Sequence, residues 1–231
     1  MLNFIRQDYH AVAGRSVFAT TDPRRTFSSN ISDVLLIVAP YFSSMSEGFK
    51  IHKQDAAYFL TLQVVYWIDL FSRKRYRDII VDSLNYCCTK KGLTVYAYVI
   101  MSNHIHMIVS ADNKDLSALI RDIKSFTCKQ LIASIFNHTE SRREWMIKLF
   151  RHAASKHQRN TTYQIWTHEN HAEECYSPKF TWRRINYIHE NPVRAGIVKA
   201  AEDYIYSSAS DYAGQKGLVP ICILHPHLVF S

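Results

Sequence analysis

Hydrophobic positions after residue 56 follow first a strand-like and then a helix-like pattern. Residues 57–70 (AYFLTLQVVYWIDL) are dense in β-branched and aromatic side chains, which predicts a strand. Residues 76–91 carry hydrophobic side chains at helical spacing, and Gly92 stands where a helix C-cap belongs. A short basic loop, residues 72–75, is predicted between the two elements.

The next segment predicts two more strands and a second helix. Residues 93–101 and 104–110 have the composition of strands, with a tight turn at residues 102–103 between them. Asp115 is a candidate N-cap for a helix that runs to about residue 137. Leucine, isoleucine and phenylalanine side chains form one hydrophobic stripe along that helix.

The order of these elements, β-α-β-β-α, is most of the split βαβ or ferredoxin-like arrangement. We therefore predict an α+β fold, in which an antiparallel sheet carries helices on one face. A short strand at residues 162–167 would complete the sheet. Extra C-terminal helical structure includes a helix at residues 182–191, which Pro192 is expected to stop.

The two ends of the chain lack this regular pattern. Residues 1–45 show no sustained helical or strand period, and turn-forming residues cluster at 20–23 and 28–30. We expect residues 1–45 to be a poorly ordered extension. The domain itself is predicted to span residues 46–212, followed by a C-terminal tail at 213–231.

The charge balance favours a polyanionic partner. The 231-residue chain is 47% hydrophobic, which is enough for a buried core. Its 28 lysines and arginines exceed 20 acidic residues, for a net charge of +8. Such an excess suits nucleic acid, because phosphate contacts release counterions and so drive binding.

Cysteine usage and the N-terminal sequence predict a cytoplasmic protein. The five cysteines form no CxxC pair and no evident disulfide framework, so thiols in a reducing compartment are expected. The N-terminal region lacks the features of a secretory signal. Its longest apolar stretch, residues 34–39, is much shorter than the roughly 20 residues that span a bilayer, so no membrane partner is expected.

Two histidines in the predicted third strand are the first candidates for chemistry. Side chains at positions i and i+2 of a strand share a face about 7 Å apart, so His104 and His106 can converge on one metal ion. The alternative is that both are polar residues on a solvated face. A second His-x-His triplet, at residues 225–227, contains a proline that suits a central strand poorly, and we treat it as incidental.

A tyrosine and an asparagine in the predicted C-terminal helix are the second candidates. Tyr187 and Asn191 are four residues apart and therefore share one face of that helix. Because Pro192 disfavours helical geometry in the residue before it, Asn191 is expected at the helix end with its amide oxygen toward a ligand. The alternative is that Tyr187 is a half-buried core tyrosine.

These residue types fit phosphodiester chemistry. Attack on a phosphodiester needs a nucleophile in line and a group that absorbs charge on the phosphoryl oxygens. A tyrosine hydroxyl is mostly protonated at pH 7, so it needs activation. A divalent ion held by two histidines and an amide oxygen would polarise the phosphate. A pair of histidines is also a common ligand set for Zn²⁺. A Mg²⁺ or Mn²⁺ ion at the same pair would need oxygen atoms of the substrate to complete its coordination shell.

Two motifs resemble one known family. Residues 98–109 (YVIMSNHIHMIV) resemble the HUH motif of the single-strand tyrosine transposases. Residues 187–198 (YIHENPVRAGIV) closely resemble the tyrosine helix of the REP-associated, IS200-like branch. The resemblance covers roughly residues 46–212. One departure is visible, because Ser102 stands where the family usually has a proline before Asn-His.

The resemblance implies a ferredoxin-like HUH domain that uses Mg²⁺ or Mn²⁺. In it, His104 and His106 would be metal ligands, Asn191 a third ligand and Tyr187 the nucleophile. It also implies single-stranded DNA, often with a hairpin, that is cleaved to a 5′-phosphotyrosine and a free 3′-OH. Relatives include two-fold dimers that share active sites, so a homodimer is one expectation.

Several basic and aromatic side chains are candidates for DNA contacts. The candidates for phosphate contacts are Arg73, Lys74, Arg75, Arg142, Arg143, Arg183 and Arg194. A solvated surface is the ordinary alternative for each of these charges. Tyr163, Trp166 and Trp182 could stack on unpaired bases, although core packing is favoured for the two tryptophans.

Other readings of the sequence stay open at this point. A domesticated DNA-binding or DNA-processing protein that acts on repeated palindromes would keep the fold without transposition. An RNA-binding ferredoxin-like module would place stacking aromatics such as Tyr96 and Tyr98 on its central strands. His168, His171 and Cys175 have the spacing of half a zinc site, but no fourth ligand is evident.

Overall fold

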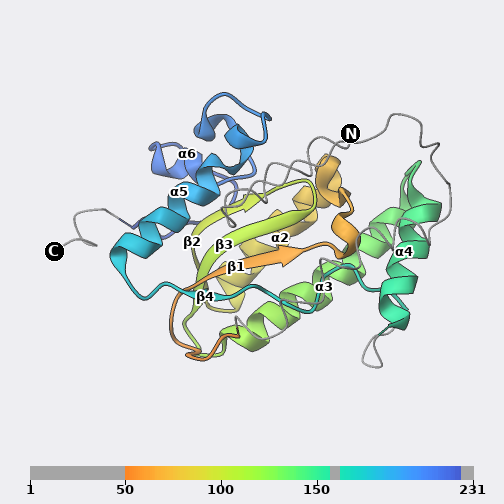
Figure 1. Ribbon diagram of the computed structural model, residues 1–231, viewed down its shortest axis with the longest axis horizontal. Helices are drawn as coiled ribbons and strands as arrows, with labels where there is room; N and C mark the ends of the chain where they lie inside the picture. Colours follow the sequence, from red (N-terminus) through yellow and green to blue (C-terminus); the bar gives the residue numbers. More distant parts are fainter. Residues whose placement is uncertain (1–49, 157–161, 225–231) are drawn as a thin grey trace, which may run out of the picture. The chain divides into compact units, whose positions relative to one another are not determined.

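The computed structural model of the protein describes residues 50–156 and 162–224 (Figure 1). The predicted extension, residues 1–45, and its boundary lie outside this part of the chain. None of the described helices is long and hydrophobic enough to cross a lipid bilayer.

A four-stranded antiparallel sheet forms the centre of the fold. Its strands are β1 (Tyr58–Gln63), β2 (Leu93–Ile100), β3 (His104–Ala111) and β4 (Glu173–Glu174), in the spatial order β2-β3-β1-β4. The two long strands that are parallel to each other, β1 and β2, are separated by β3, as the split βαβ arrangement requires. The predicted α+β, ferredoxin-like class is confirmed.

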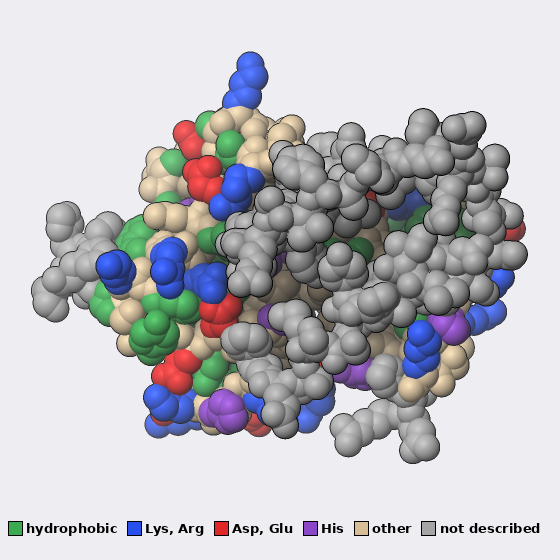
Figure 2. Space-filling model, in the orientation of Figure 1, with side chains coloured by type: hydrophobic (Ala, Val, Ile, Leu, Met, Phe, Trp, Pro, Cys, Tyr) green, Lys and Arg blue, Asp and Glu red, His purple; other side chains and the backbone are tan. Residues whose placement is uncertain are grey.

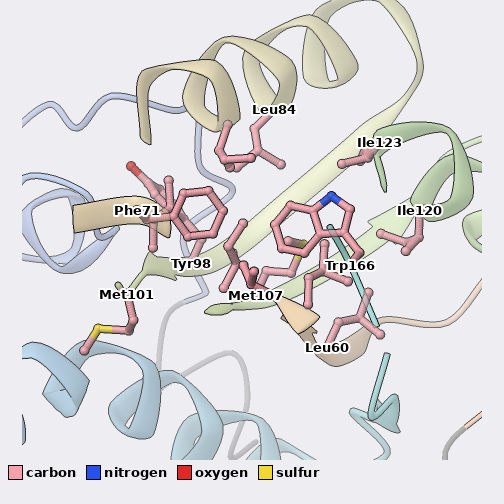
Figure 3. Packing of buried hydrophobic residues seen from close by; sticks show 14 of the residues in the cluster. Leu60, Phe71, Leu84, Tyr98, Met101, Met107, Ile120, Ile123 and Trp166 are labelled. Carbon is pink, nitrogen blue, oxygen red and sulfur yellow. The ribbon is translucent and has the colours of Figure 1, made fainter. Parts of the chain in front are cut away.

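Two helices cover one face of the sheet. Helix α2 (Lys74–Lys90) connects β1 to β2, and helix α3 (Leu116–Asn137) follows β3. Figure 3 shows how this face is filled, with side chains of both helices against those of the strands. The labelled residues there include Leu60 and Met107 from the sheet, Leu84 from α2, and Ile120 and Ile123 from α3.

Local signals at the ends of these two helices act as predicted. Lys91 is the C-cap of α2, and Gly92 follows with a φ of 69°, a conformation that glycine adopts without strain. The side chain of Asp115 accepts a hydrogen bond from the backbone N–H of Ala118 and so caps α3. The predicted basic loop at residues 72–75 is wrong in part, because α2 already begins at Lys74.

The predicted first strand is shorter than its hydrophobic run. After β1 the chain turns through two short 3-10 helices, η2 (Val65–Trp67) and η3 (Leu70–Ser72). Tyr66 and Trp67 lie in the left-handed region, with φ values of 56° and 54°, so the strand cannot continue through them. The hydrophobic side chains that follow are buried in the core without extending the sheet.

The predicted fourth strand at residues 162–167 is wrong. In this segment Trp166 makes only an isolated bridge to Val64, and the fourth strand is instead Glu173–Glu174, which pairs with β1. The reason is that β1 ends at Gln63 and the chain then turns into η2, so pairing does not continue along this segment. The indole ring of Trp166 is buried in the core, stacks on Phe71 and donates to Thr127 Oγ1 over 2.9 Å. Core packing of Trp166, the favoured alternative to base stacking, is confirmed.

Helix α5 (Pro178–Arg194) is longer at both ends than predicted. Ser177 caps its N-terminus, and Pro178 takes the first helical position, where proline is tolerated. Pro192 does not stop the helix, because it lies in the last turn. There the N–H of Ala195 still reaches the carbonyl of Asn191, at 3.0 Å.

Helix α5 packs on the sheet face opposite to α2 and α3. The ring of Tyr187 contacts the rings of Phe59 and His106, whose side chains alternate with those of Leu60 and Met107. Two helices therefore lie on one face as predicted, and one of the extra C-terminal helices covers the other. The sequence of α5 alone does not predict which face of the sheet this helix covers.

The remaining elements lie beyond the sheet. Helix α4 (Arg143–Ser155), which the sequence pattern did not predict, follows α3. After α5 come η4 (Ala201–Asp203) and α6 (Ala209–Tyr212). Between these two, residues 206–208 run along the outer edge of β2, where Ile100 donates to the carbonyl of Tyr206 and Ser208 donates to that of Tyr98.

Replacing Asp115 with alanine should destabilise the domain by about 1 kcal/mol, because α3 then loses its N-terminal cap. Urea unfolding followed by circular dichroism would measure this loss. The control is Asp122→Ala, which removes an exposed carboxylate from the same helix. Equal unfolding midpoints for Asp115→Ala and the wild type would contradict the role of the cap.

Candidate functional site

The two predicted histidines lie side by side on the sheet face that α5 covers. His104 and His106 both project from β3 to this face, and their ring centroids are 4.6 Å apart. Their exposed fractions are only 8% and 7%, which rules out the alternative of a solvated pair. Ile105 between them is buried on the opposite face, as the strand alternation predicts.

Hydrogen bonds fix the orientation of both imidazole rings. Nδ1 of His106 lies 2.9 Å from Oγ1 of Thr61, its register partner on β1. Nδ1 of His104 lies 2.7 Å from Oδ1 of Asn103, and since an amide oxygen only accepts, Nδ1 carries the proton. Each Nδ1 is therefore engaged, while neither Nε2 has a hydrogen-bond partner among the described residues.

A further set of contacts holds the Asn103 amide in place. Its Nδ2 donates to Oδ1 of Asp69 at 3.2 Å and to the carbonyl of Trp67 at 3.4 Å. The hydroxyl of Ser102 donates to the same carboxylate oxygen of Asp69 at 2.6 Å. The serine that replaces the usual proline thus ties the turn to η3 by a hydrogen bond. Such outer contacts orient metal-binding histidines in many proteins.

Burial keeps both imidazoles neutral at pH 7. It lowers the pKa of His104 to about 4, and burial together with the neighbouring His104 lowers the pKa of His106 well below its ordinary value. A neutral imidazole with a free Nε2 is the form that binds a metal ion. The donor set of His104 and His106 therefore fits a divalent cation.

The pair needs ligands of another kind to complete a metal site. Among the described residues, no group of three or more histidine, cysteine, aspartate or glutamate side chains could hold a metal ion. This finding also argues against the zinc half-site at His168, His171 and Cys175. An amide oxygen or the substrate itself would have to supply the remaining ligands.

Tyr187 lies directly against the histidine pair. Its ring centroid is 5.2 Å from that of His106 at an interplanar angle of 66°, and its hydroxyl has no hydrogen-bond partner among the described residues. Arg194 also contacts Tyr187. Its guanidinium lies 4.5 Å from the centroid of the tyrosine ring and donates a hydrogen bond to the backbone carbonyl of Tyr187 at 2.9 Å. Tyr187 is therefore half-buried, yet its hydroxyl forms no hydrogen bond with the described core residues.

Asn191 lies one turn beyond Tyr187 and is 4% exposed. Its Nδ2 is 3.4 Å from the carbonyl oxygen of Tyr187, which accepts this bond. The predicted position at the helix end is wrong, because α5 continues to Arg194. The role of its Oδ1 as a third ligand stays a prediction.

The predicted DNA-binding residues near η3 contact other parts of the protein. Arg73 and Arg142 both bind the buried carboxylate of Glu140, at 2.8 and 3.0 Å. Arg75 donates to the carbonyl of Thr139, Lys74 pairs with Asp78, and Arg143 donates to the carbonyls of Ile135 and His138. The contacts of Arg73 and Arg75 join the start of α2 to the connection between α3 and α4. Contact of these residues with DNA stays a prediction.

The other two predicted DNA-binding residues belong to α5. Arg183 is exposed and stacks on Phe180, and Arg194 is exposed beside Tyr187. On the coloured part of the face in Figure 2, lysine and arginine side chains lie at several separate places, with acidic side chains among them. Of the predicted basic residues, Arg194 is the one in contact with the nucleophile candidate.

Sequence reasoning missed the residues that support the site. Thr61 and Phe59 on β1 contact His106, and Arg184 on α5 stacks over Phe59 and pairs with Glu173. The alternating pattern of β1 placed Thr61 and Phe59 on one face, but only the register with β3 shows their partner. The RNA-binding alternative is not supported, because Tyr98 is fully buried and lies on an outer strand of the sheet.

Residues 53–164 match the sequence model of the family described as "Transposase IS200 like". This match confirms the resemblance to IS200-like transposases, and it includes both histidines but ends before α5. The family match supports a function as a transposase that processes DNA. No curated protein matches the chain.

Several solved structures also match the chain. One is described as "Structure of the REP associates tyrosine transposase bound to a REP hairpin" and is 20% identical to this chain. The alignment covers 78% of this chain and 94% of the other, with a TM-score of 0.48.

The Glu140 cluster predicts a pH-dependent part of the stability. Burial alone would raise the pKa of Glu140, but hydrogen bonds from Arg142, Tyr76 and Arg73 lower it from 4.5 to about 2. Because the folded-state pKa is the lower one, the stabilisation is complete above about pH 4.5 and is lost as the pH falls toward 2.

Glu140→Gln should therefore destabilise the protein at pH 7 by roughly 3 kcal/mol, and the difference from the wild type should shrink below about pH 4.5. Urea unfolding at a series of pH values would measure both. Glu144→Gln, on an exposed glutamate of α4, is the matched control. A difference that does not change with pH would show that the ion pairs of Glu140 are not its source.

Proposed function

We propose that this protein is a transposase that cleaves and rejoins single-stranded, hairpin-associated DNA through a covalent 5′-phosphotyrosine on Tyr187. The observation that carries the proposal is the contact between Tyr187 and His106 within one chain. The Tyr187 hydroxyl lies beside two buried, neutral histidines, and neither this hydroxyl nor the two Nε2 atoms bond to any residue that the structure describes. Binding DNA alone would need none of these features.

In the proposed reaction, the phenolic oxygen of Tyr187 attacks phosphorus and the phenol gives up its proton. The bond from phosphorus to the 3′ oxygen breaks, and that oxygen takes a proton and leaves as a 3′-hydroxyl. The DNA then remains attached to the protein through its 5′-phosphate, which conserves the bond for a second strand transfer. A Mg²⁺ or Mn²⁺ ion held by His104, His106 and Asn191 would neutralise charge on the phosphoryl oxygens.

The protein's own residues position the reacting groups. Thr61 and Asn103 hold the two imidazoles by their Nδ1 atoms, so both rings are fixed before substrate binds. The guanidinium of Arg194 contacts both the ring and the backbone carbonyl of Tyr187, which restrains this residue. It also places a positive charge next to the tyrosine side chain that carries the attacking oxygen. Such a charge favours the approach of an anionic phosphodiester.

The four residues of the candidate site come from one chain. Both histidines, Tyr187 and Asn191 belong to the same unit, in which α5 packs on its own sheet. We propose that cleavage does not require a tyrosine from a second subunit. A homodimer stays a prediction, and its active sites would not need to be shared.

Tyr187→Phe should abolish the covalent adduct and the free 3′-OH product together, because it removes only the attacking oxygen. The substrates are single-stranded oligonucleotides that together cover the DNA on either side of the gene, including every palindrome found there. A denaturing gel would show the adduct as a slower, protease-sensitive band. Tyr176→Phe, at an exposed tyrosine just before α5, is the control and should stay active. An adduct formed by Tyr187→Phe would show that another residue is the nucleophile.

His104→Ala and His106→Ala should each abolish Mg²⁺- or Mn²⁺-dependent cleavage of the same oligonucleotide. DNA binding should change little, because phosphate contacts elsewhere supply most of the affinity. Calorimetric titration with Mn²⁺ alone should show binding to the wild type and its loss in both variants. Unchanged Mn²⁺ binding in either variant would remove that histidine from the proposed ligand set.

A further inference from the structure

A group of basic and aromatic side chains lies next to the candidate site, on η2, α4 and the segment after α4. It consists of Tyr66, Arg151, His152, Lys156 and Tyr163, and is called the basic–aromatic surface below. In Figure 1, α4 lies beyond the end of β1, where η2 follows that strand. Trp67, the neighbour of Tyr66, connects this surface to the site, because its ring centroid is 6.3 Å from that of His104.

The backbone of η2 is held in an unfavourable conformation. Tyr66 and Trp67 are consecutive non-glycine residues with positive φ, a conformation that bulky L side chains rarely adopt. Backbone hydrogen bonds on either side, from Val64 to the carbonyl of Asn103 and from Val65 to that of Ile165, hold the turn. Strain of this kind concentrates at functional sites, where the surrounding structure maintains it.

The strained turn directs Tyr66 toward His152 of α4 and toward Lys156, the C-cap residue of that helix. Its ring stacks on that of His152, with centroids 6.2 Å apart and planes at 25°. Nζ of Lys156 lies 5.7 Å from the ring centroid of Tyr66. Arg151 repeats the arrangement with Tyr163, since its guanidinium lies 5.3 Å from that ring and donates to the hydroxyl at 3.0 Å.

Within the described ranges, no carboxylate neutralises the two cations of this surface, Arg151 and Lys156. Among the described residues, neither Arg151 nor Lys156 forms an ion pair with a carboxylate, in contrast to Arg73 and Arg142. Both are exposed, whereas Tyr66 and Tyr163 are partly exposed beside them. Alternating aromatic rings and unpaired cations are the combination that binds unpaired nucleotides, because rings stack on bases while cations contact phosphates.

We propose that the basic–aromatic surface binds the single strand adjoining the scissile phosphate, with Tyr66 and Tyr163 stacking on bases and Arg151 and Lys156 contacting phosphates. This inference rests on the proposed function. The two sites are neighbours, because Trp67, the residue after Tyr66, contacts His104 of the candidate site. Duplex DNA fits less well, because its bases are already stacked on one another and leave no free face for a ring.

Fluorescence anisotropy on the full chain would test the proposal. It would compare the affinity for a 30-nucleotide oligo-dT strand with the affinity for a 30-base-pair duplex. Tyr66→Gly is the informative variant, because glycine adopts positive φ without strain and the fold should persist. It should bind the single strand about 10-fold more weakly, in line with the loss of one stacked base. Lys156→Gln should also weaken binding and should reduce its dependence on salt.

Tyr86→Ala and Lys90→Gln are matched controls, because both change exposed side chains on α2, which does not belong to this surface. Their affinities should equal that of the wild type. Thermal unfolding should show that Tyr66→Gly keeps a wild-type melting temperature within a few degrees. Tyr66→Gly that stays folded and binds oligo-dT like the wild type would overturn the proposal, as would equal losses for the strand and the duplex.

The adduct assay separates failure of this inference from failure of the proposed function. Should the wild type form the phosphotyrosine adduct while Tyr66→Gly and Lys156→Gln keep full affinity for oligo-dT, only the basic–aromatic surface is refuted. Should the wild type form no adduct, the proposed function fails, whatever these variants do. Weaker strand binding together with slower adduct formation in both variants would support the two together.

Discussion

The candidate site depends on one packing interaction, that of α5 against the sheet face opposite to α2 and α3. This packing brings Tyr187 against His106, and both histidines are buried on the same sheet face. Loss of hydration is what keeps the imidazoles uncharged at neutral pH, and uncharged imidazoles can donate a lone pair to a cation. The same contact therefore positions the nucleophile candidate and prepares the metal ligands.

The alignment of β1 with β3 is the second requirement, since it decides which side chain faces each histidine. A shift of one residue would exchange the two faces and replace Thr61 with a hydrophobic neighbour beside His106. On the other side, the turn before β3 is joined to η3 through Ser102, Asn103 and Asp69. The histidine pair is thus fixed from both flanking segments before any ligand is present.

Features with a local cause could be predicted from the sequence, and features that depend on distant partners could not. The cap at Asp115, the turn at Gly92 and the shared face of His104 and His106 each follow from a few adjacent residues. A strand of two residues has no pattern, so β4 was missed. The partnership of Arg73 and Arg142 with Glu140 joins segments far apart in the chain, which the basic composition alone could not show.

The segment at residues 206–208 has a consequence for how this protein can associate. An open strand edge offers unpaired N–H and C=O groups to any neighbouring chain, and β2 would be such an edge. Here Ile100 and Tyr98 already bond to Tyr206 and Ser208. These bonds block strand addition at the C-terminal end of β2, and the opposite border of the sheet is a strand only two residues long. Within the described residues, this sheet therefore offers little open backbone for pairing with a second copy.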